Sequence, residues 1–292
     1  MLARLLLFTI LLGAALAGYA QRPALAKPAS YTSTKVLKSN SLFAIDTLLD
    51  VGGHRLHFHI VKGHGPIILF ESGGGDEWTE WQPILAPLYR ATGATLVAYD
   101  RAGFGSSELD STQISLSQQI SSLKTGLAKL HLDQACVLVA HSYGGYLATL
   151  FAATYPGQVK GVVFVDATQV AFWTDAQVNR FLTEYAPVKE RVHKEAPGRY
   201  WMYVNMPAIT RQMRQTRFPA HIPAVLLLAE RSPFATADET KRWQQAQRQF
   251  VAQAPNRRLL LATGSGHYIM RDKPALVVNT ITQLYRASSL KK

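Results

Sequence analysis

A serine stands among small residues in the run Ala140-His141-Ser142-Tyr143-Gly144-Gly145. The run follows an apolar stretch at 136–139 and precedes an apolar helical pattern at 147–151. A serine at a sharp turn between a strand and a helix is typical of a nucleophile, because the turn exposes its hydroxyl above the sheet. Small residues two positions before and after it let the helix cross close to the strand. Ser-x-Gly-Gly also occurs in loops and at helix N-termini, so the run alone leaves its chemistry open.

A reactive serine needs a base beside it, because a free hydroxyl is a poor nucleophile at neutral pH, and histidine is the usual base. His267 follows the apolar run 257–262 in the flexible context Ser265-Gly266-His267, which suits a base. His57 and His59 share one face of an alternating strand, as a metal pair would. No third ligand stands at matching spacing, so we predict a solvated strand face there and no metal site. His141 is expected to be a packed neighbour of the serine.

Strand and helix patterns alternate along the chain. One strand, 54–61, shows period-two alternation, which indicates antiparallel pairing. Short apolar runs that suit buried parallel strands lie at 67–71, 95–99, 135–140, 161–166, 224–229 and 257–262. Helical patterns lie at about 78–91, 111–130, 143–155, 237–253 and 273–287. This order predicts an α/β fold with a mostly parallel, doubly wound sheet.

Residues 168–220 break the rhythm. They contain no convincing strand but many aromatic and Met side chains, which predicts a helical insertion between two strands of the sheet. Such side chains offer a large dry surface, and we take Phe172, Trp173 and Trp201 as substrate-binding residues. The same composition also fits the interior of a lid.

Two further motifs complete an ordered set. Glu71-Ser72-Gly73-Gly74-Gly75-Asp76 and Asp100-Arg101-Ala102-Gly103-Phe104-Gly105 each follow an apolar strand. With the serine and histidine motifs, they have the order and spacing of the α/β-hydrolase fold superfamily, and the chain resembles its serine esterases and lipases from about Leu48 to Leu284. The resemblance implies an α/β-hydrolase core at 46–167 and 221–288, with a helical cap at 168–220 between the family's sixth and seventh strands.

The resemblance also implies roles for residues at matching positions. Ser142 would be the nucleophile and His267 the base. The oxyanion hole would take its N–H groups from Tyr143 and Gly74, with Gly73 as the alternative one register away. The Asp100 turn would pin loops beside the site.

The triad acid stays open between three carboxylates. The family usually places it after the strand that follows the cap, but Ser232 stands at that position. Some members place the acid one strand earlier, where this chain has Asp166, and we favour that residue over Glu230 and Asp238. The acid fixes the tautomer of the imidazole and stabilises its protonated form.

These residues predict a serine hydrolase that cleaves carboxylic esters with apolar acyl or aromatic groups through an acyl-enzyme, with no cofactor. A lactonase, an aminopeptidase or a C–C bond hydrolase would use the same residues, and a non-catalytic binding protein on this fold is a different class of alternative. The chain has a net charge of +12, but its Lys and Arg residues do not follow the spacing of a nucleic-acid-binding motif. We therefore expect no nucleic-acid partner.

The N-terminus resembles a targeting segment. Arg4 precedes an apolar run that is short for a membrane span and ends in small residues, so we predict a signal peptide at 1–20 and a linker at 21–45. The protein would then be secreted or periplasmic, or held at a membrane if the segment stays uncleaved. Cys136, the single cysteine, lies in a predicted buried strand and excludes an intrachain disulfide.

Overall fold

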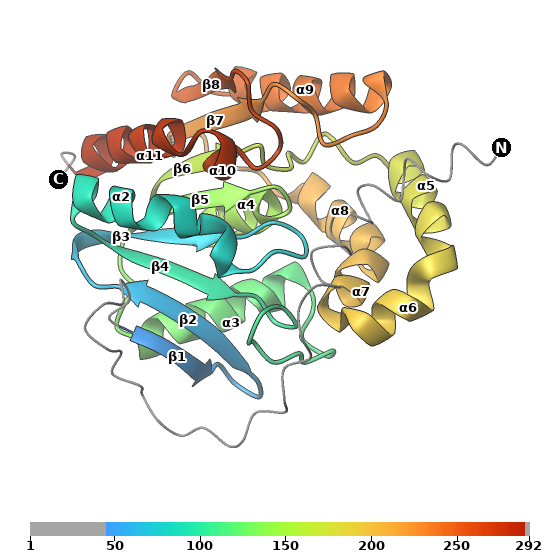
Figure 1. Ribbon diagram of the computed structural model, residues 1–292, viewed down its shortest axis with the longest axis horizontal. Helices are drawn as coiled ribbons and strands as arrows, with labels where there is room; N and C mark the ends of the chain where they lie inside the picture. The colour runs from blue at the N-terminus through green and yellow to red at the C-terminus, as the bar shows by residue number, and fades with distance from the viewer. Residues whose placement is uncertain (1–44, 290–292) are drawn as a thin grey trace.

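The computed structural model describes residues 45–289, which form an eight-stranded sheet flanked by helices on both faces (Figure 1). The spatial order of the strands is β1-β2-β4-β3-β5-β6-β7-β8. The strands from β4 to β8 in that order run parallel, whereas β1 and β2 join antiparallel at one edge. The strand bounds are Ile45–Asp50 for β1, Arg55–Val61 for β2, His64–Glu71 for β3, Ala94–Asp100 for β4, Cys136–His141 for β5, Val159–Val165 for β6, Ala224–Ala229 for β7 and Arg257–Ala262 for β8.

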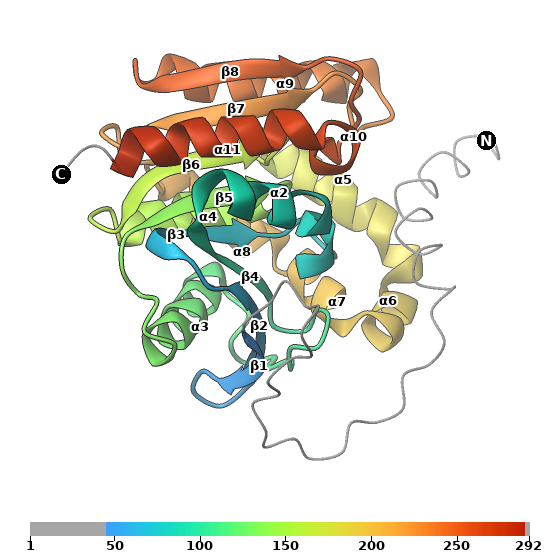
Figure 2. The same ribbon diagram turned by 60° about the vertical axis from the view of Figure 1, so that its left-hand side comes forward.

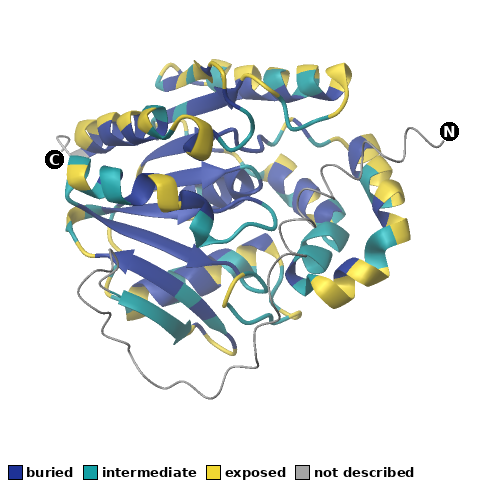
Figure 3. Ribbon diagram, viewed as in Figure 1, coloured by how far each residue is buried: buried dark blue, intermediate teal, exposed yellow. Residues whose placement is uncertain are grey.

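The central strands are mostly apolar because both of their faces are covered, and Glu71, Asp100 and His141 stand at their carboxyl ends. Alternate side chains of β3 and β5 enter two separate cores, and β5 and the later part of β3 are buried (Figure 3). Ile67 and Leu69 belong to the core that also contains buried residues of α3 (Leu116–Lys129), α4 (Gly144–Thr154) and the end of α9 (Ala237–Ala252). Ile68 and Phe70 face α2 (Gln82–Thr92) and α11 (Pro274–Ser289). The doubly wound α/β sheet predicted from the sequence is therefore confirmed.

The insertion between β6 and β7 is helical, as predicted, and lies beside the carboxyl ends of the parallel strands (Figures 1 and 2). Its elements are α5 (Asp175–Tyr185), η2 (Ala186–Val188), α6 (Lys189–Glu195), α7 (Pro197–Val204) and α8 (Met206–Gln215). Helix α5 begins with a reciprocal capping box between Thr174 and Gln177, which satisfies two backbone donors at its first turn. We call residues 168–220 the cap.

The N-terminal boundary differs from the sequence prediction. Ile45 is not linker but the first residue of β1, which pairs along its whole length with β2. The strand escaped prediction because its side chains are only half-buried and carry no clear alternation. The predicted signal peptide and nearly all of the predicted linker lie outside the described residues. Within residues 45–289, no helix has the length and apolarity needed to cross a membrane.

Helix α4 leaves β5 through a turn that brings it onto the backbone of β3. A Cβ added at Gly144 would lie 2.3 Å from the carbonyl oxygen of Glu71, so no larger residue fits without movement of the strand or the helix. A Cβ at Gly145 would lie 2.6 Å from the carbonyl oxygen of Thr168. These two close approaches set the position of the turn at Ser142.

Replacing Gly144 by Ala should therefore destabilise the fold. We expect the Gly144→Ala variant to lose about 2 kcal/mol or more of unfolding free energy, because its methyl group collides with rigid backbone. Gly157→Ala is the matched control, since a Cβ there meets nothing within 4 Å, and it should change stability by less than about 0.5 kcal/mol. Urea unfolding of both variants measures the difference, and equal stabilities would show that the helix has room to shift.

Candidate active site

Ser142 lies at the turn between β5 and α4 with a φ of 49°, in the left-handed region that non-glycine residues rarely adopt. Its carbonyl oxygen accepts hydrogen bonds from the N–H of Gly145 at 3.0 Å and of Thr168 at 2.8 Å. These bonds hold the strained turn, which is the local structure that the sequence motif predicts. The serine lines a pocket between the sheet edge and the cap.

His267 and Asp166 come together at the carboxyl edge of the sheet, although β7 lies between their strands β8 and β6. Nδ1 of His267 lies 2.6 Å from Oδ2 of Asp166, and the carboxylate is fully buried. The other carboxylate oxygen accepts hydrogen bonds from the indole N–H of Trp243 at 3.0 Å and from the backbone N–H of Ala229 at 3.2 Å. These three donors fix the carboxylate. If Nδ1 carries the proton, Nε2 of His267 remains the basic nitrogen.

The two alternative acids lie elsewhere. Glu230 is exposed and accepts the backbone N–H of Gly264 at 2.5 Å. Asp238 is exposed in the first turn of α9 and forms an ion pair with Arg242. Of the three carboxylates considered from the sequence, the structure brings Asp166 to the imidazole. Trp243, which the sequence did not point to, is a second contact of that carboxylate.

The glycine loop after β3 faces the serine. Gly74 and Tyr143 both line the pocket, whereas the N–H of Gly73 donates to Oε1 of Glu80 at 2.9 Å. Gly73 is therefore committed to a structural bond, which favours Gly74 as the oxyanion donor of this loop. Tyr143 is the N-cap residue of α4, where backbone N–H groups lack helical partners and the helix dipole favours negative charge.

Asp100 and Arg101 hold the loops, as the sequence suggested. Arg101 donates to the carbonyl oxygens of Ser72 and Gly73, and Asp100 accepts the backbone N–H groups of Trp78 at 3.0 Å and Ser106 at 3.1 Å. These hydrogen bonds fix the loops on either side of the serine.

A buried pair that the sequence did not predict lies behind the site. Oε2 of Glu80, in the short helix η1 (Trp78–Trp81), lies 2.8 Å from Nδ1 of His141. Nε2 of His141 lies 3.2 Å from the carbonyl oxygen of His267. Glu80 thus connects the glycine loop, the end of β5 and the loop that carries His267. Only the position of His141 next to the serine hinted at this role.

The hydrogen-bond pattern assigns a proton to this pair. A carbonyl oxygen only accepts, so the N–H of His141 must be at Nε2, facing His267. Burial lowers the pKa of His141 to about 3, so its ring is neutral at pH 7 and Nδ1 is an acceptor. Glu80 must then be the donor, and burial raises the pKa of its carboxyl to about 7.

The pocket is about 220 Å³ in volume and its lining is mainly apolar. Besides Gly74, Ser142, Tyr143 and His267, it is lined by Trp173, Phe181, Met202, Tyr203, Met206, Phe234 and Trp243, among others. Glu239 also reaches it but is held by an ion pair with Arg180 and a 2.7 Å hydrogen bond from Thr236. The volume fits a small acyl or aromatic group.

Two of the three predicted substrate-binding residues do not line this pocket. Trp173 does, but Phe172 is buried in a cluster with Trp243 and Phe234 that supports the pocket from behind. Trp201 borders a separate small cavity beside Phe104. Aromatic composition predicted an apolar cap interior but not which side of each helix faces the serine.

The chain belongs to the alpha/beta hydrolase family, whose model matches residues 67–280. It is a hydrolase of this superfamily. The protein YqjL of Bacillus subtilis is 22% identical over 244 residues, which are 82% of this chain and 91% of that protein. The 2-hydroxy-6-oxo-2,4-heptadienoate hydrolase of Pseudomonas putida is 28% identical over 131 residues, 44% of this chain and 46% of that enzyme.

Among solved structures, an esterase from Thermogutta terrifontis superposes with a TM-score of 0.59 at 20% identity. The match covers 84% of this chain and 98% of the esterase. At this identity the likeness shows the shared fold alone.

The protonated form of Glu80 can be tested with its isostere. Glu80→Gln places an amide N–H where the carboxyl proton would be, so we expect catalytic activity within about threefold of the wild type. Glu80→Ala leaves Gly73 and His141 unpaired and should lower kcat at least about tenfold. Activity assays of the two variants measure this difference, and an equal loss in both would mean that the carboxylate itself is required.

The raised pKa of Glu80 predicts that the unfolding free energy depends on pH, and Glu80→Gln tests this. Because the folded pKa of Glu80 is raised from 4.5 to about 7, the folded state holds a proton that the unfolded chain releases. The carboxyl therefore destabilises the fold progressively as pH rises from about 4.5 to 7, and the penalty is constant above that. Relative to the wild type, Glu80→Gln should gain on the order of 2 kcal/mol between pH 5 and pH 8. Urea unfolding at both values is the measurement, and a constant difference would contradict it.

Proposed function

We propose that this protein is a serine hydrolase that cleaves small carboxylic esters with apolar acyl or aromatic groups. The observation that carries the proposal is the buried Asp166–His267 hydrogen bond of 2.6 Å beside a pocket that Ser142 lines. A base oriented by a carboxylate, next to a serine on a strained turn, is the arrangement that activates a hydroxyl.

The mechanism has two acyl-transfer steps. The Ser142 hydroxyl attacks the ester carbonyl while Nε2 of His267 accepts its proton, and the N–H groups of Gly74 and Tyr143 stabilise the oxyanion. The tetrahedral intermediate collapses, and His267 protonates the departing alkoxide. Water, deprotonated by His267, then attacks the acyl-enzyme and releases the acid and Ser142. Asp166 holds the imidazole and stabilises its positive charge in both steps.

The volume of the pocket favours small substrates. Its volume of about 220 Å³ is below the usual range of drug-sized sites, about 300–1,000 Å³, so a short acyl chain or one aromatic ring fits and a long chain does not. The aromatic and methionine side chains of the cap provide apolar contact but few polar groups for recognition.

Cleavage of a carbon–carbon bond is the second candidate, because the Pseudomonas putida relative is a 2-hydroxy-6-oxo-2,4-heptadienoate hydrolase. The apolar lining of the pocket favours the ester. Within the described lining Glu239 is the charged side chain, and no lysine or arginine is there to bind the carboxylate of such a dienoate.

The nucleophile is tested by covalent labelling. A fluorophosphonate probe should label the purified protein, and Ser142→Ala should abolish labelling and lower hydrolysis of p-nitrophenyl acetate by at least about 10³-fold. The wild type should prefer acetate or butyrate esters to the palmitate. An unlabelled wild type that hydrolyses none of these esters would sink the proposal.

The identity of the triad acid is tested by replacing two candidate carboxylates, Asp166 and Glu230, each with its amide. Asp166→Asn should lower kcat by about 10³–10⁴-fold, because it no longer fixes the tautomer of His267. Glu230→Gln, on the next strand end, should leave kcat within about twofold. Steady-state kinetics with circular dichroism as a folding check decide between them, and the opposite ranking would move the acid to Glu230.

A further inference from the structure

Four chemistry-bearing side chains gather on one face of β1, β2 and β4, and none of them lines the catalytic pocket. His57 and His59 are two positions apart on β2, so both point to the same face. Strand pairing sets Asp46 of β1 opposite His59 and Asp100 of β4 opposite His57. Backbone register alone therefore brings two imidazoles and two carboxylates together.

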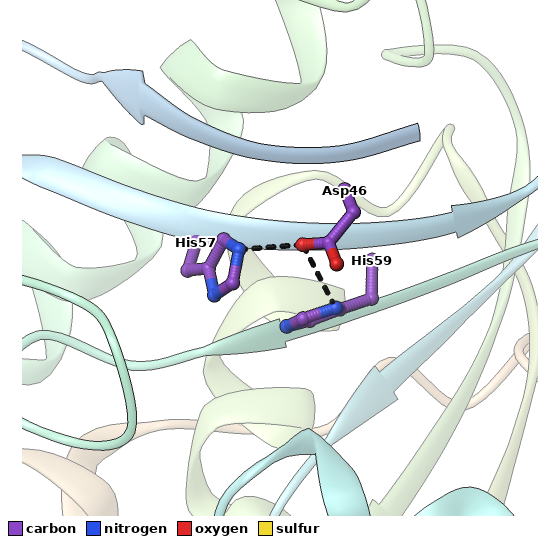
Figure 4. Close-up of side chains that lie close together, drawn as sticks. All are labelled: Asp46, His57 and His59. Atoms are coloured by element: carbon purple, nitrogen blue, oxygen red, sulfur yellow. Dashed lines mark ion pairs between the residues drawn. The ribbon is translucent and has the colours of Figure 1, made fainter. Parts of the chain in front are cut away.

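Asp46 turns toward both rings (Figure 4). Its Oδ1 lies 2.6 Å from Nε2 of His57 and 3.4 Å from Nδ1 of His59. Donor atoms around a tetrahedral zinc ion with bonds of about 2.0–2.1 Å are roughly 3.3 Å apart. The separation between Asp46 and His59 matches that value. The separation between Asp46 and His57 would have to increase by under about 1 Å, which a rotation of the Asp46 side chain supplies.

The face is not the solvated surface expected from the sequence. The side chain of His59 is 3% exposed and stacks on Trp78 with 4.2 Å between ring centroids, while His57 is 20% and Asp46 32% exposed. The candidate third ligand is Asp46, which lies in a strand that the sequence analysis did not detect. An ion could reach the cluster from the side of Asp46 and His57.

Asp100 lies on the other side of the two rings. Its Oδ2 is 3.7 Å from Nδ1 of His57 and 4.0 Å from Nε2 of His59, the ring nitrogens that face away from Asp46. These distances are too long for a hydrogen bond, but a turn of either imidazole toward Asp100 would form one, and a carboxylate bonded in that way orients a metal-binding ring and increases its basicity. The backbone bonds that Asp100 accepts hold it in this place.

We propose that Asp46, His57 and His59 bind one divalent transition-metal ion, Zn²⁺ in the first instance. Two imidazole nitrogens and one carboxylate oxygen suit Zn²⁺, Co²⁺ and Ni²⁺, whereas Mg²⁺ and Ca²⁺ prefer oxygen ligands. With neutral imidazoles, the two positive charges of the ion balance the charges of Asp46 and Asp100. Water completes the coordination.

The ion fastens the edge of the sheet. Within the described residues β1 is an edge strand that pairs with β2, and Ile45, Leu49 and the Asp50–Lys129 contact also hold it to the core. An ion between Asp46 and the two histidines cross-links β1 to β2. The site is therefore structural, and its loss affects stability more than the chemistry at Ser142.

The test uses the full chain without a polyhistidine tag, stripped with chelator. Calorimetric titration should give one Zn²⁺ per chain and no binding of Mg²⁺, and Co²⁺ should give visible d–d absorption. Saturating Zn²⁺ should raise the midpoint of thermal unfolding by about 5 °C. Asp46→Asn and His59→Gln should each weaken binding at least about thirtyfold, while His221→Gln, an exposed histidine, should leave it unchanged.

Two results would overturn the proposal. One is a wild type that binds no Zn²⁺, and the other is binding that survives both ligand substitutions. Glu80→Gln serves as a second control because Asp76, Glu80 and His141 form another group of possible ligands, and loss of binding in that variant alone would place the ion there instead. The His59→Gln variant could fail to fold because His59 is buried. Asp46 is partly exposed, so the Asp46→Asn variant should fold, and its Zn²⁺ affinity then tests the proposal.

Discussion

The catalytic edge of this protein depends on how closely helix α4 approaches strand β3. Contact between Gly144 and the backbone of Glu71 forces the chain to turn sharply after β5, and Ser142 takes a left-handed conformation there. Such a conformation costs free energy, which the surrounding packing and the two bonds to the Ser142 carbonyl offset. The same turn begins helix α4, and Ser142 and Tyr143 both line the pocket there. One packing constraint thus sets the positions of the proposed nucleophile and of one proposed oxyanion donor.

Buried polar groups then hold the loops around that turn. Arg101 ties down the carbonyls of the glycine loop, and Glu80 binds its N–H while holding His141 against the carbonyl of His267. In a low-dielectric interior a satisfied network is rigid, and an unsatisfied one is costly. A protonated Glu80 satisfies its partners without placing a net charge behind the site, whereas Asp166, with three donors, sits where positive charge develops on His267.

The sequence predicted the parts of this arrangement that are local. Each motif follows an apolar strand, and parallel strands end at one edge, so the motifs alone were enough to place Ser142 and His267 together. The acid could not be settled that way, because Asp166 and Glu230 follow neighbouring strands; a 2.6 Å contact with His267 separates them, and sequence spacing does not. Glu80 and Trp243 were missed because each acts on a residue far along the chain, and Asp46 was missed because it lies in strand β1. Strand β1 was missed because half-buried strands lack a strong pattern.

Helix α7 of the cap packs closely on two loops of the core, and each close contact involves a glycine. Gly198 of α7 lies on Gly103, a Cβ at Gly75 would collide with Arg199, and one at Gly74 would lie 3.0 Å from Met202. The first contact joins α7 to the Asp100 turn and the other two join it to the glycine loop, so the helix sits directly on the loop that carries the proposed oxyanion donor Gly74. Met202 lines the pocket while touching Gly74, which means that the pocket wall and the oxyanion donor share one packed surface. Under the proposed mechanism, substrate size and oxyanion geometry are therefore not independent: a group large enough to displace Met202 also disturbs the backbone of the proposed oxyanion donor Gly74.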